Sequence, residues 1–336
     1  MKMLLRPPAL RRGDAIGYFS PSSPATAFAP TRYARAQAYL RGRGFRLVSG
    51  SLSGASDHYR SGSIMARADE LNALLRNPDV RCVMSTIGGA NSNSIVPYID
   101  YDALVRDPKI VIGYSDATAI LLAIHQMTGL VTFYGPALVA SFGEFAPVVD
   151  TTYDFFESLL MGSGAPPYPY PMPTHWTDEM IPWEAQDRAK VLRPNTWTFH
   201  GTGTALGRLV GGNLNTMWGI WGSPYMPEIR EGDVLLIEDS LKPISTVERL
   251  FAFLKLNGVF DRVSAVLLGK HELFKDGDTG RTPMDVLTEV LAGQSLRVVE
   301  GFDCCHTHPM MTMPLGCEVR IDFDAQQVST ETPWLA

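Results

Sequence analysis

The first half of the chain alternates strand-like segments with helix-like segments, and this alternation constrains the fold more than any other feature. The strand-like segments are AIGYFSPSSP, FRLVSG, RCVMSTIGG and KIVIGYS. The helix-like segments between them, with apolar residues at helical spacing, are TRYARAQAYLRGRG, SIMARADELNALLRNPDV and DATAILLAIHQMTG. Such alternation predicts an α/β fold with a parallel sheet and helices on its faces.

The pattern changes twice along the chain, and the changes predict three regions. Residues 166–173 read PPYPYPMP, too rich in proline for a helix or a central strand. From Thr202 onward, glycine-punctuated segments, strands and helices are mixed. A chain of 336 residues suits about two domains. We predict an N-terminal α/β domain over 1–165, a linker and substrate loop over 166–200, and a mixed C-terminal domain over 201–336.

Charge and cysteine content argue against several classes of protein. The net charge is -6 and the basic residues form no long run, so neither nucleic acid nor an anionic membrane is indicated as a partner. Four cysteines are too few for a disulfide framework in a chain of this length, which favours reduced thiols. No apolar stretch has the length expected of a signal peptide or a membrane helix. We therefore expect a cytoplasmic protein.

Ser115 stands where a predicted strand becomes a helix, within KIVIGYSDATAILLAIHQ. A serine at a helix start commonly caps free backbone N–H groups. The position also suits a nucleophile, because Gly113 permits a sharp turn and the helix start offers N–H groups to a developing negative charge. The segment resembles a nucleophile elbow, although Ala117 replaces the second glycine of G-x-S-x-G. These residues alone leave both interpretations open.

A second loop, IGGANSN at 87–93, also follows a predicted strand. In parallel sheets, ligands gather at the carboxyl ends of the strands. Paired glycines allow a backbone amide to come close to a bound carbonyl group, but they are equally typical of a loop that needs positive φ.

A serine nucleophile needs a general base within hydrogen-bond reach. Among seven histidines, His306 and His308 in CCHTHP stand out, since alternate residues of an extended segment share one side. The adjacent Cys304 and Cys305 introduce a zinc site as an alternative, but no second ligand pair follows at metal-binding spacing. We predict that His306 is a general base.

The base in turn needs an orienting carboxylate. Glu238 ends the apolar run DVLLIE, so its scaffold would hold it in place, and Asp239 is the competing choice. Both acids would also suit the cap of a turn.

The irregular segment HWTDEMIPWEAQDRAKVLRPNTWTFHG contains Trp176, Trp183 and Trp197. These rings would suit either a ligand site or the covering of a core, and the sequence pattern favours neither.

Taken together, the motifs resemble the LD-carboxypeptidase family of serine peptidases, in its branch of microcin C self-immunity peptidases. The segments that carry this resemblance, in chain order, are STIGGANSNSIVPYIDYDAL, GYSDATAILLAI, FYGPALVASFGEF, LVGGNLNT, GSPYMPEI, LIEDS, VERLFAFLKLNGVFD and DCCHTHPMMTMPLG. The resemblance implies an N-terminal doubly wound parallel-sheet domain and a C-terminal mixed domain with a barrel-like sheet, assembled as a homodimer.

The resemblance also implies the roles of individual residues. Ser115 would be the nucleophile, Glu238 the orienting acid and His306 the general acid and base. The backbone N–H groups of Gly89 and Asp116 would form the oxyanion hole. No metal or organic cofactor is implied.

In that branch the substrate is an aminoacyl or peptidyl nucleotide, cleaved at the amide bond next to the nucleotide phosphoramidate. The resemblance gives base stacking to Trp183, with Trp176 and Trp197 as alternatives, and adds Asn91 and Asn213 as substrate-binding residues. A murein tetrapeptide LD-carboxypeptidase would use the same chemistry on another substrate. A non-catalytic nucleotide-binding protein is the alternative of another class, and in it Ser115 would only cap its helix.

Overall fold

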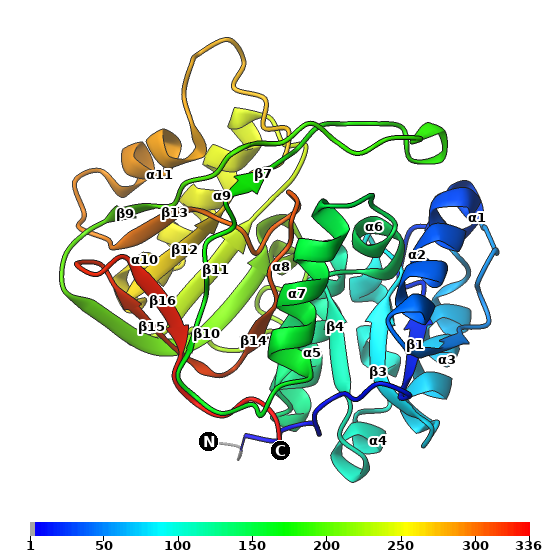
Figure 1. The fold of residues 1–336 in the computed structure, drawn as a ribbon. Coiled ribbons are helices and arrows are strands. Elements are labelled where there is room, and N and C mark those ends of the chain that lie inside the picture. The colour runs from blue at the N-terminus through cyan, green and yellow to red at the C-terminus, as the bar shows by residue number, and fades with distance from the viewer. Residues whose placement is uncertain (1–3) are drawn as a thin grey trace.

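The computed structural model of the protein describes residues 4–336, in which two large sheets lie side by side with helices around them (Figure 1). The first sheet has the strand order β14-β5-β4-β3-β1-β2. Its strands are β1 (Ala15–Phe19), β2 (Arg46–Ser49), β3 (Val80–Ser85), β4 (Ile110–Gly113), β5 (Thr132–Tyr134) and β14 (Met313–Leu315). β1 to β5 run parallel, which confirms the predicted parallel sheet.

The side chains of β1, β4 and β5 are buried along their whole length, as expected for central strands of a sheet that is covered on both faces. The helices and 3₁₀ turns of this half are α1 (Ala25–Phe28), α2 (Pro30–Gly42), α3 (Ile64–Arg76), η1 (Ser92–Tyr98), α4 (Tyr101–Arg106), η2 (Ser115–Ala117), α5 (Thr118–Thr128), α6 (Leu138–Phe142) and α7 (Val148–Leu160). Local signals explain their ends. The Ser63 side chain caps α3, and Gly129 ends α5 with φ 78°.

The second sheet has the order β6-β16-β15-β10-β11-β12-β13-β9 and curls into a half-barrel. Its strands are β6 (Tyr168–Pro169), β9 (Thr198–His200), β10 (Thr204–Asn213), β11 (Val234–Glu238), β12 (Ala265–Gly269), β13 (Val298–Phe302), β15 (Glu318–Asp322) and β16 (Gln327–Thr330). The central strands β10 to β13 are parallel and the outer ones antiparallel. The mixed, barrel-like second half is therefore confirmed.

The helices of this half are α8 (Leu214–Trp218), α9 (Ile244–Leu256), α10 (Val259–Arg262) and α11 (Pro283–Leu291). Across residues 4–336, no helix combines the length and the apolar character needed to cross a bilayer.

The chain returns from the predicted C-terminal domain, 201–336, to the sheet of the predicted N-terminal domain, 1–165. β14 comes from the last part of the sequence, yet it pairs antiparallel with β5 at the edge of the first sheet. Apolar side chains from both sheets belong to one continuous core cluster. Each sheet and its helices form one lobe. The two lobes therefore share a hydrophobic core and are also joined by the chain.

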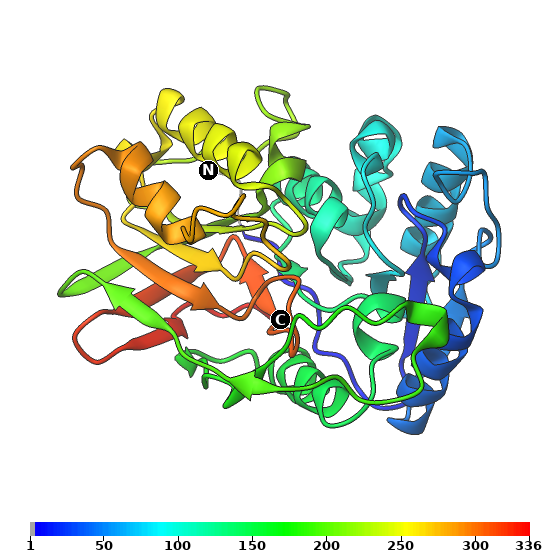
Figure 2. The ribbon, with the colours of Figure 1, turned by 90° about the horizontal axis from the view of Figure 1, so that it is seen from above.

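The proline-rich stretch holds one short edge strand, β6, which pairs with β16. An edge position tolerates proline because one side of the strand needs no ladder hydrogen bond. Beyond it, β7 (His175–Trp176) pairs with β8 (Arg193–Pro194), and between them the chain reaches over to α1 and α2 (Figure 2). We call residues 174–197 the crossing segment. The turn η3 (Trp183–Ala185) lies at its far end.

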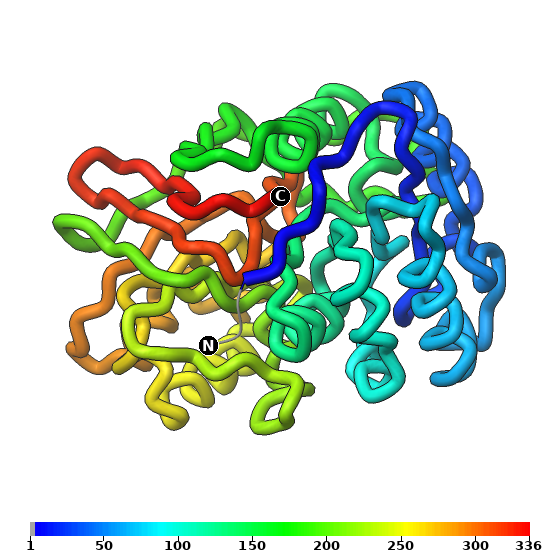
Figure 3. The backbone as a smooth tube through the Cα atoms, turned by 90° about the horizontal axis from the view of Figure 1, so that it is seen from below, coloured from blue at the N-terminus to red at the C-terminus, as the bar shows by residue number. Residues whose placement is uncertain are grey.

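The two ends of the described chain lie side by side (Figure 3). The N–H of Ala336 donates a hydrogen bond to the carbonyl of Pro7 at 2.9 Å. The C-terminal strands therefore end against the lobe in which the chain begins.

Candidate active site

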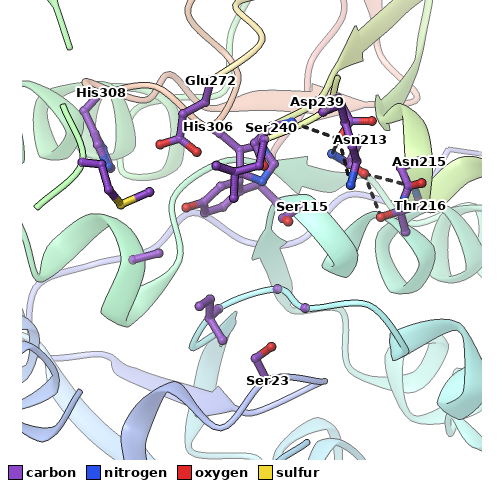
Figure 4. A pocket seen from close by; sticks show the side chains of 18 of the residues that line it. Ser23, Ser115, Asn213, Asn215, Thr216, Asp239, Ser240, Glu272, His306 and His308 are labelled. Carbon is purple, nitrogen blue, oxygen red and sulfur yellow. Dashed lines mark hydrogen bonds and ion pairs between the residues drawn. The ribbon is translucent and has the colours of Figure 1, made fainter. Parts of the chain in front are cut away.

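A cavity of about 370 Å³ is lined by residues from both halves of the chain (Figure 4). Its wall includes Gly88, Gly89, Ser115, Trp183, Asn213 and His306. Ser115 follows β4, and Asn213 ends β10. These are carboxyl ends of parallel strands, where ligands of open α/β sheets bind.

Ser115 adopts a left-handed backbone conformation, with φ 59°. This region is costly for a residue with a Cβ atom, and such strain gathers at functional turns. The Ser115 side chain caps neither η2 nor α5, since neither helix has a side-chain cap. The capping interpretation is therefore wrong, and the hydroxyl is left facing the cavity.

Gly88 lies directly against Ser115. A Cβ atom on Gly88 would stand 2.7 Å from both Cβ and Oγ of Ser115, and 2.8 Å from the backbone nitrogen of Asp116. Real Cβ atoms do not approach other heavy atoms this closely, so only glycine lets the loop at 87–93 reach the turn.

The carboxylate of Asp116 ties this loop to the turn. It accepts hydrogen bonds from the N–H groups of Asn91 at 2.9 Å and Ser92 at 2.8 Å. Within residues 4–336, the backbone N–H groups of Gly89 and Asp116 themselves have no hydrogen-bond partner. Gly89 lines the same cavity as Ser115, and Asp116 follows Ser115 in the chain.

Glu238 and His306 form a buried pair. Nδ1 of His306 lies 2.5 Å from Oε2 of Glu238, and the backbone N–H of His306 donates to the same oxygen at 3.2 Å. Burial would raise the pKa of Glu238, but the charge and hydrogen bond of His306 outweigh it and hold that pKa below its usual value. Burial likewise would lower the pKa of His306, but Glu238 holds it above 6.5. Because Nδ1 is engaged, Nε2 is the ring nitrogen left for other partners.

Ser115 and His306 face the same cavity (Figure 4). In the described part of the chain no hydrogen bond joins Oγ of Ser115 to the imidazole. Catalytic hydrogen bonds are often long in ligand-free structures and shorten when substrate binds. The ring of Tyr114 packs edge-on against the imidazole, with centroids 4.9 Å apart, and limits its rotation.

The three tryptophans occupy different environments. Trp183 lines the cavity, with the guanidinium of Arg32 4.5 Å from its ring centroid. Trp176 lies outside the cavity wall under the cation of Arg193. Trp197 is 8% exposed and donates its indole N–H to Asp303. Trp183 alone of the three faces the site.

The two asparagines expected to bind substrate are already occupied by protein partners. The Asn91 side-chain oxygen accepts from Ser22 and Arg67, and Asn91 is not part of the cavity wall. The Asn213 amide donates to Glu238 and Asp239, and its oxygen accepts from the N–H and hydroxyl of Thr216. In this structure Asn91 holds a loop and Asn213 holds an acid and caps α8.

The motif reading missed Tyr134, which is wholly buried and donates its hydroxyl to Glu238 at 2.6 Å. Nor did the sequence single out four charged residues of the cavity wall, Glu179, Lys190, Lys242 and Glu272. Tyr134 lies within FYGPALVASFGEF, one of the segments that carry the family resemblance. Its residue type alone does not show which carboxylate its hydroxyl contacts.

The cysteines that prompted the zinc alternative are buried thiols. Cys304 donates to the carbonyls of Tyr134 and Met311, and Cys305 contacts the hydroxyl of Thr307. Burial raises the pKa of Cys305 to about 12. A cysteine binds zinc as a thiolate, so this environment does not favour Cys305 as a zinc ligand.

Comparison with known proteins identifies the family of this chain. The chain matches the LD-carboxypeptidase N-terminal domain over residues 16–135 and the LD-carboxypeptidase C-terminal domain over residues 206–321. The chain belongs to the LD-carboxypeptidase family. As a member of this peptidase family, it is a serine hydrolase.

Individual relatives are similar over nearly the whole chain. A putative carboxypeptidase of Vibrio cholerae is 62% identical over 97% of this chain and 98% of its own length. The microcin C7 self-immunity protein MccF of Escherichia coli is 54% identical over 96% of this chain and 95% of its own length. A solved structure of that self-immunity protein in complex with aspartyl sulfamoyl adenosine has a TM-score of 0.97, with 54% identity, over 99% of this chain and 100% of that one.

Proposed function

We propose that this LD-carboxypeptidase family member hydrolyses the amide bond between an amino acid and the nucleotide of aminoacyl or peptidyl nucleotides, and so detoxifies microcin C-type antibiotics. One observation carries the proposal. A buried Glu238–His306 pair and the strained Ser115 come from different lobes and meet at one cavity, which Trp183 also lines. Identity of 54% to a self-immunity protein over the whole length supports the nucleotide substrate.

In the proposed reaction, Nε2 of His306 takes the Ser115 proton while Oγ attacks the substrate carbonyl. The negative charge of Glu238 stabilises the imidazolium that forms. The free N–H groups of Gly89 and Asp116 hold the oxyanion. His306 then protonates the leaving nitrogen, the amino-nucleotide departs, and an acyl-enzyme remains. Water, deprotonated by the same histidine, releases the amino acid and restores Ser115.

Trp183 is the proposed platform for the nucleobase. Its ring lines the cavity wall, and the guanidinium of Arg32 packs on it. Stacking of a base on an aromatic ring is worth about 1–3 kcal/mol. The structural partners of Trp176 and Trp197 leave these two rings supporting the fold.

We place the protein in the cytoplasm and expect it to act as a homodimer, as the family resemblance implies. Neither the chemistry nor the substrate site proposed above depends on the second copy.

The first prediction separates a nucleophile from a helix cap. Ser115→Ala should lower kcat for aspartyl sulfamoyl adenosine by at least about 10³-fold, the scale found for triad residues, with the melting temperature little changed. Ser63→Ala is the matched control, because Ser63 does cap α3. This control should lose about 1 kcal/mol of stability and keep its activity.

Two outcomes would contradict the proposal. Full activity in Ser115→Ala would exclude Ser115 as the nucleophile. Turnover of a murein tetrapeptide, with none of the aminoacyl sulfamoyl nucleoside, would assign the chain to cell-wall recycling. Both substrates should therefore be assayed side by side with product identification by mass spectrometry.

A further inference from the structure

Oxygen Oε1 of Glu238 does not contact His306. It accepts two other hydrogen bonds, one from the hydroxyl of Tyr134 at 2.6 Å and one from the side-chain amide of Asn213 at 3.1 Å. Each donor belongs to a path of hydrogen bonds, and both paths end on the backbone of Ser115.

The first path is short. The backbone N–H of Ser115 donates to the hydroxyl oxygen of Tyr134 at 3.1 Å, and that hydroxyl donates its own proton to Glu238. Burial raises the pKa of Tyr134 well above 10.0, so the phenol keeps the proton that it donates. One buried side chain thus joins the nucleophile's peptide to the acid of the proposed triad.

The second path reaches the other side of the same residue. The hydroxyl of Thr118 donates to the Ser115 carbonyl at 2.6 Å and accepts from the backbone N–H of Asn213 at 3.0 Å. The side chain of Asn213 then reaches Glu238. The N–H and the carbonyl of Ser115 are therefore both held, and the two paths close into a ring at Oε1.

The ring spans the two lobes. On the side of the first sheet, Ser115 begins the turn η2, Thr118 begins α5 and Tyr134 ends β5. Asn213 and Glu238 end β10 and β11 of the second sheet. The two lobes approach closely here, since a Cβ atom on Gly212 would lie 2.8 Å from the Tyr134 ring and from Thr118.

We propose that Tyr134 is a positioning residue that holds the left-handed backbone of Ser115 in register with Glu238 across the lobe boundary. This inference rests on the proposed function, in which Ser115 attacks and Glu238 orients His306. A residue with φ 59° needs its surroundings to maintain that conformation, and Tyr134 supplies the hydrogen bond that holds its backbone N–H. A buried carboxylate likewise needs donors, and Tyr134 gives the shorter of the two on Oε1.

Loss of the Tyr134 hydroxyl would change the pKa of the Glu238–His306 pair as well as the geometry of the site. With one donor fewer, the carboxylate of Glu238 binds a proton on His306 more strongly, and the pKa of the pair rises. The other titratable groups that interact with this pair in the described chain include Tyr114, Asp239, His271, Glu272, Cys304, Cys305 and His308. Tyr134→Phe alters none of them, so a shift would report the lost hydroxyl.

The test compares Tyr134→Phe with Tyr170→Phe. Tyr170 is another buried tyrosine, bonded through its hydroxyl to Thr330 at 2.8 Å and absent from the cavity wall. Tyr134→Phe should lower kcat by up to about 10²-fold, the effect of a small displacement of reacting groups, with KM little changed. The acidic limb of its pH profile should move to higher pH. Tyr170→Phe should match the parent in kcat and in pH profile.

A second variant covers the case in which Tyr134→Phe does not fold. Thr118→Val cuts the other path at nearly constant volume and should lower kcat, with the acidic limb unmoved because Thr118 does not touch Glu238. Parent-like kcat and pH profile in folded Tyr134→Phe would overturn the inference, as would parent-like kcat in Thr118→Val if Tyr134→Phe cannot be made.

The inference and the proposed function can fail separately. A parent protein that turns over no aminoacyl nucleotide contradicts the proposed function. Titration of the His306 imidazole by NMR in ¹³C-histidine-labelled protein needs no turnover. A higher His306 pKa in Tyr134→Phe than in Tyr170→Phe would still support the positioning role, and equal values would overturn it.

Discussion

At the scale of single residues, the proposed reaction makes the reactivity of Ser115 depend on the protonation state of the Glu238–His306 pair. His306 must be neutral to accept the Ser115 proton, and Glu238 favours its charged form. The nearest surface analogue is the pair of His200 and Glu300, 2.8 Å apart and partly exposed. The chain thus contains one buried His–Glu pair, proposed to be catalytic, and one partly exposed His–Glu pair that serves for comparison.

The pH dependence of activity follows from the raised pKa of His306. As pH falls through that pKa, His306 becomes protonated and activity is lost, so the acidic limb of kcat/KM should lie above 6.5. Glu238→Gln removes the charge that raises the pKa, and its limb should move to lower pH while kcat falls. Glu300→Gln should leave the profile unchanged. A parent limb at or below 6.5 would contradict this prediction.

At the scale of elements, the crossing segment 174–197 brings Trp183 to the cavity with little regular structure of its own. Buried charged side chains hold this segment in place. The carboxylate of Glu144 is 1% exposed and accepts from Arg32, Gln186 and Lys190. Arg32 in turn bonds Gln186 and packs on the Trp183 ring. The position of the Trp183 ring therefore depends on Glu144, which does not line the cavity.

Glu144→Gln should loosen the crossing segment. Removing one partner of a buried ion pair costs about 3–5 kcal/mol, so the melting temperature should fall. KM for the nucleotide substrate should rise by about 10-fold or more, while kcat changes less, because the triad contacts remain. Glu157→Gln is the control, since Glu157 pairs with Arg12 at the surface at 2.8 Å. An unchanged KM in folded Glu144→Gln would contradict the role of Glu144.

At the scale of the whole molecule, the last part of the chain returns to the first lobe. β14 extends the first sheet. Trp334, which is 2% exposed, donates its indole N–H to the carbonyl of Leu159 in α7 at 2.7 Å. The proposed catalytic groups come from both lobes, and these returning segments join the lobes.

Trp334→Ala should therefore weaken the entire fold. Truncation of a buried tryptophan costs about 3–5 kcal/mol, and the midpoint of urea unfolding should fall accordingly. Tryptophan fluorescence and far-UV circular dichroism should report one shared transition in the parent protein. At temperatures where the variant is folded, its kcat should match the parent, since Trp334 is remote from the cavity wall. Two separate transitions in the parent would contradict shared stability.

Several features were predictable from sequence because they depend on local patterns. Alternating strand and helix segments predict the parallel sheet, since periodicity reflects which faces each element buries. Ser115 and Glu238 stood out because they lie at the ends of predicted strands, and His306 stood out because it alternates with His308 in CCHTHP. The family resemblance then assigned them roles.

Other features depend on contacts between distant segments, for which residue type is a poor guide. Asn91 and Asn213 have the chemistry of substrate-binding groups, yet their hydrogen bonds are used within the protein. Tyr134 carries no motif of its own and meets Glu238 across 104 positions of sequence.

The amino-acid sequence by itself determined the succession of strands and helices, the sharp turn that Gly113 permits before Ser115 and the kinds of group available for catalysis. Those follow from side-chain size, periodicity and backbone freedom over a few residues. Only the tertiary structure decided that β14 would join the first sheet, that Trp183 would face the cavity, and that a ring of hydrogen bonds would close on Glu238. Burial leaves each of these groups only the partners that packing brings within reach, and packing is set by the whole chain.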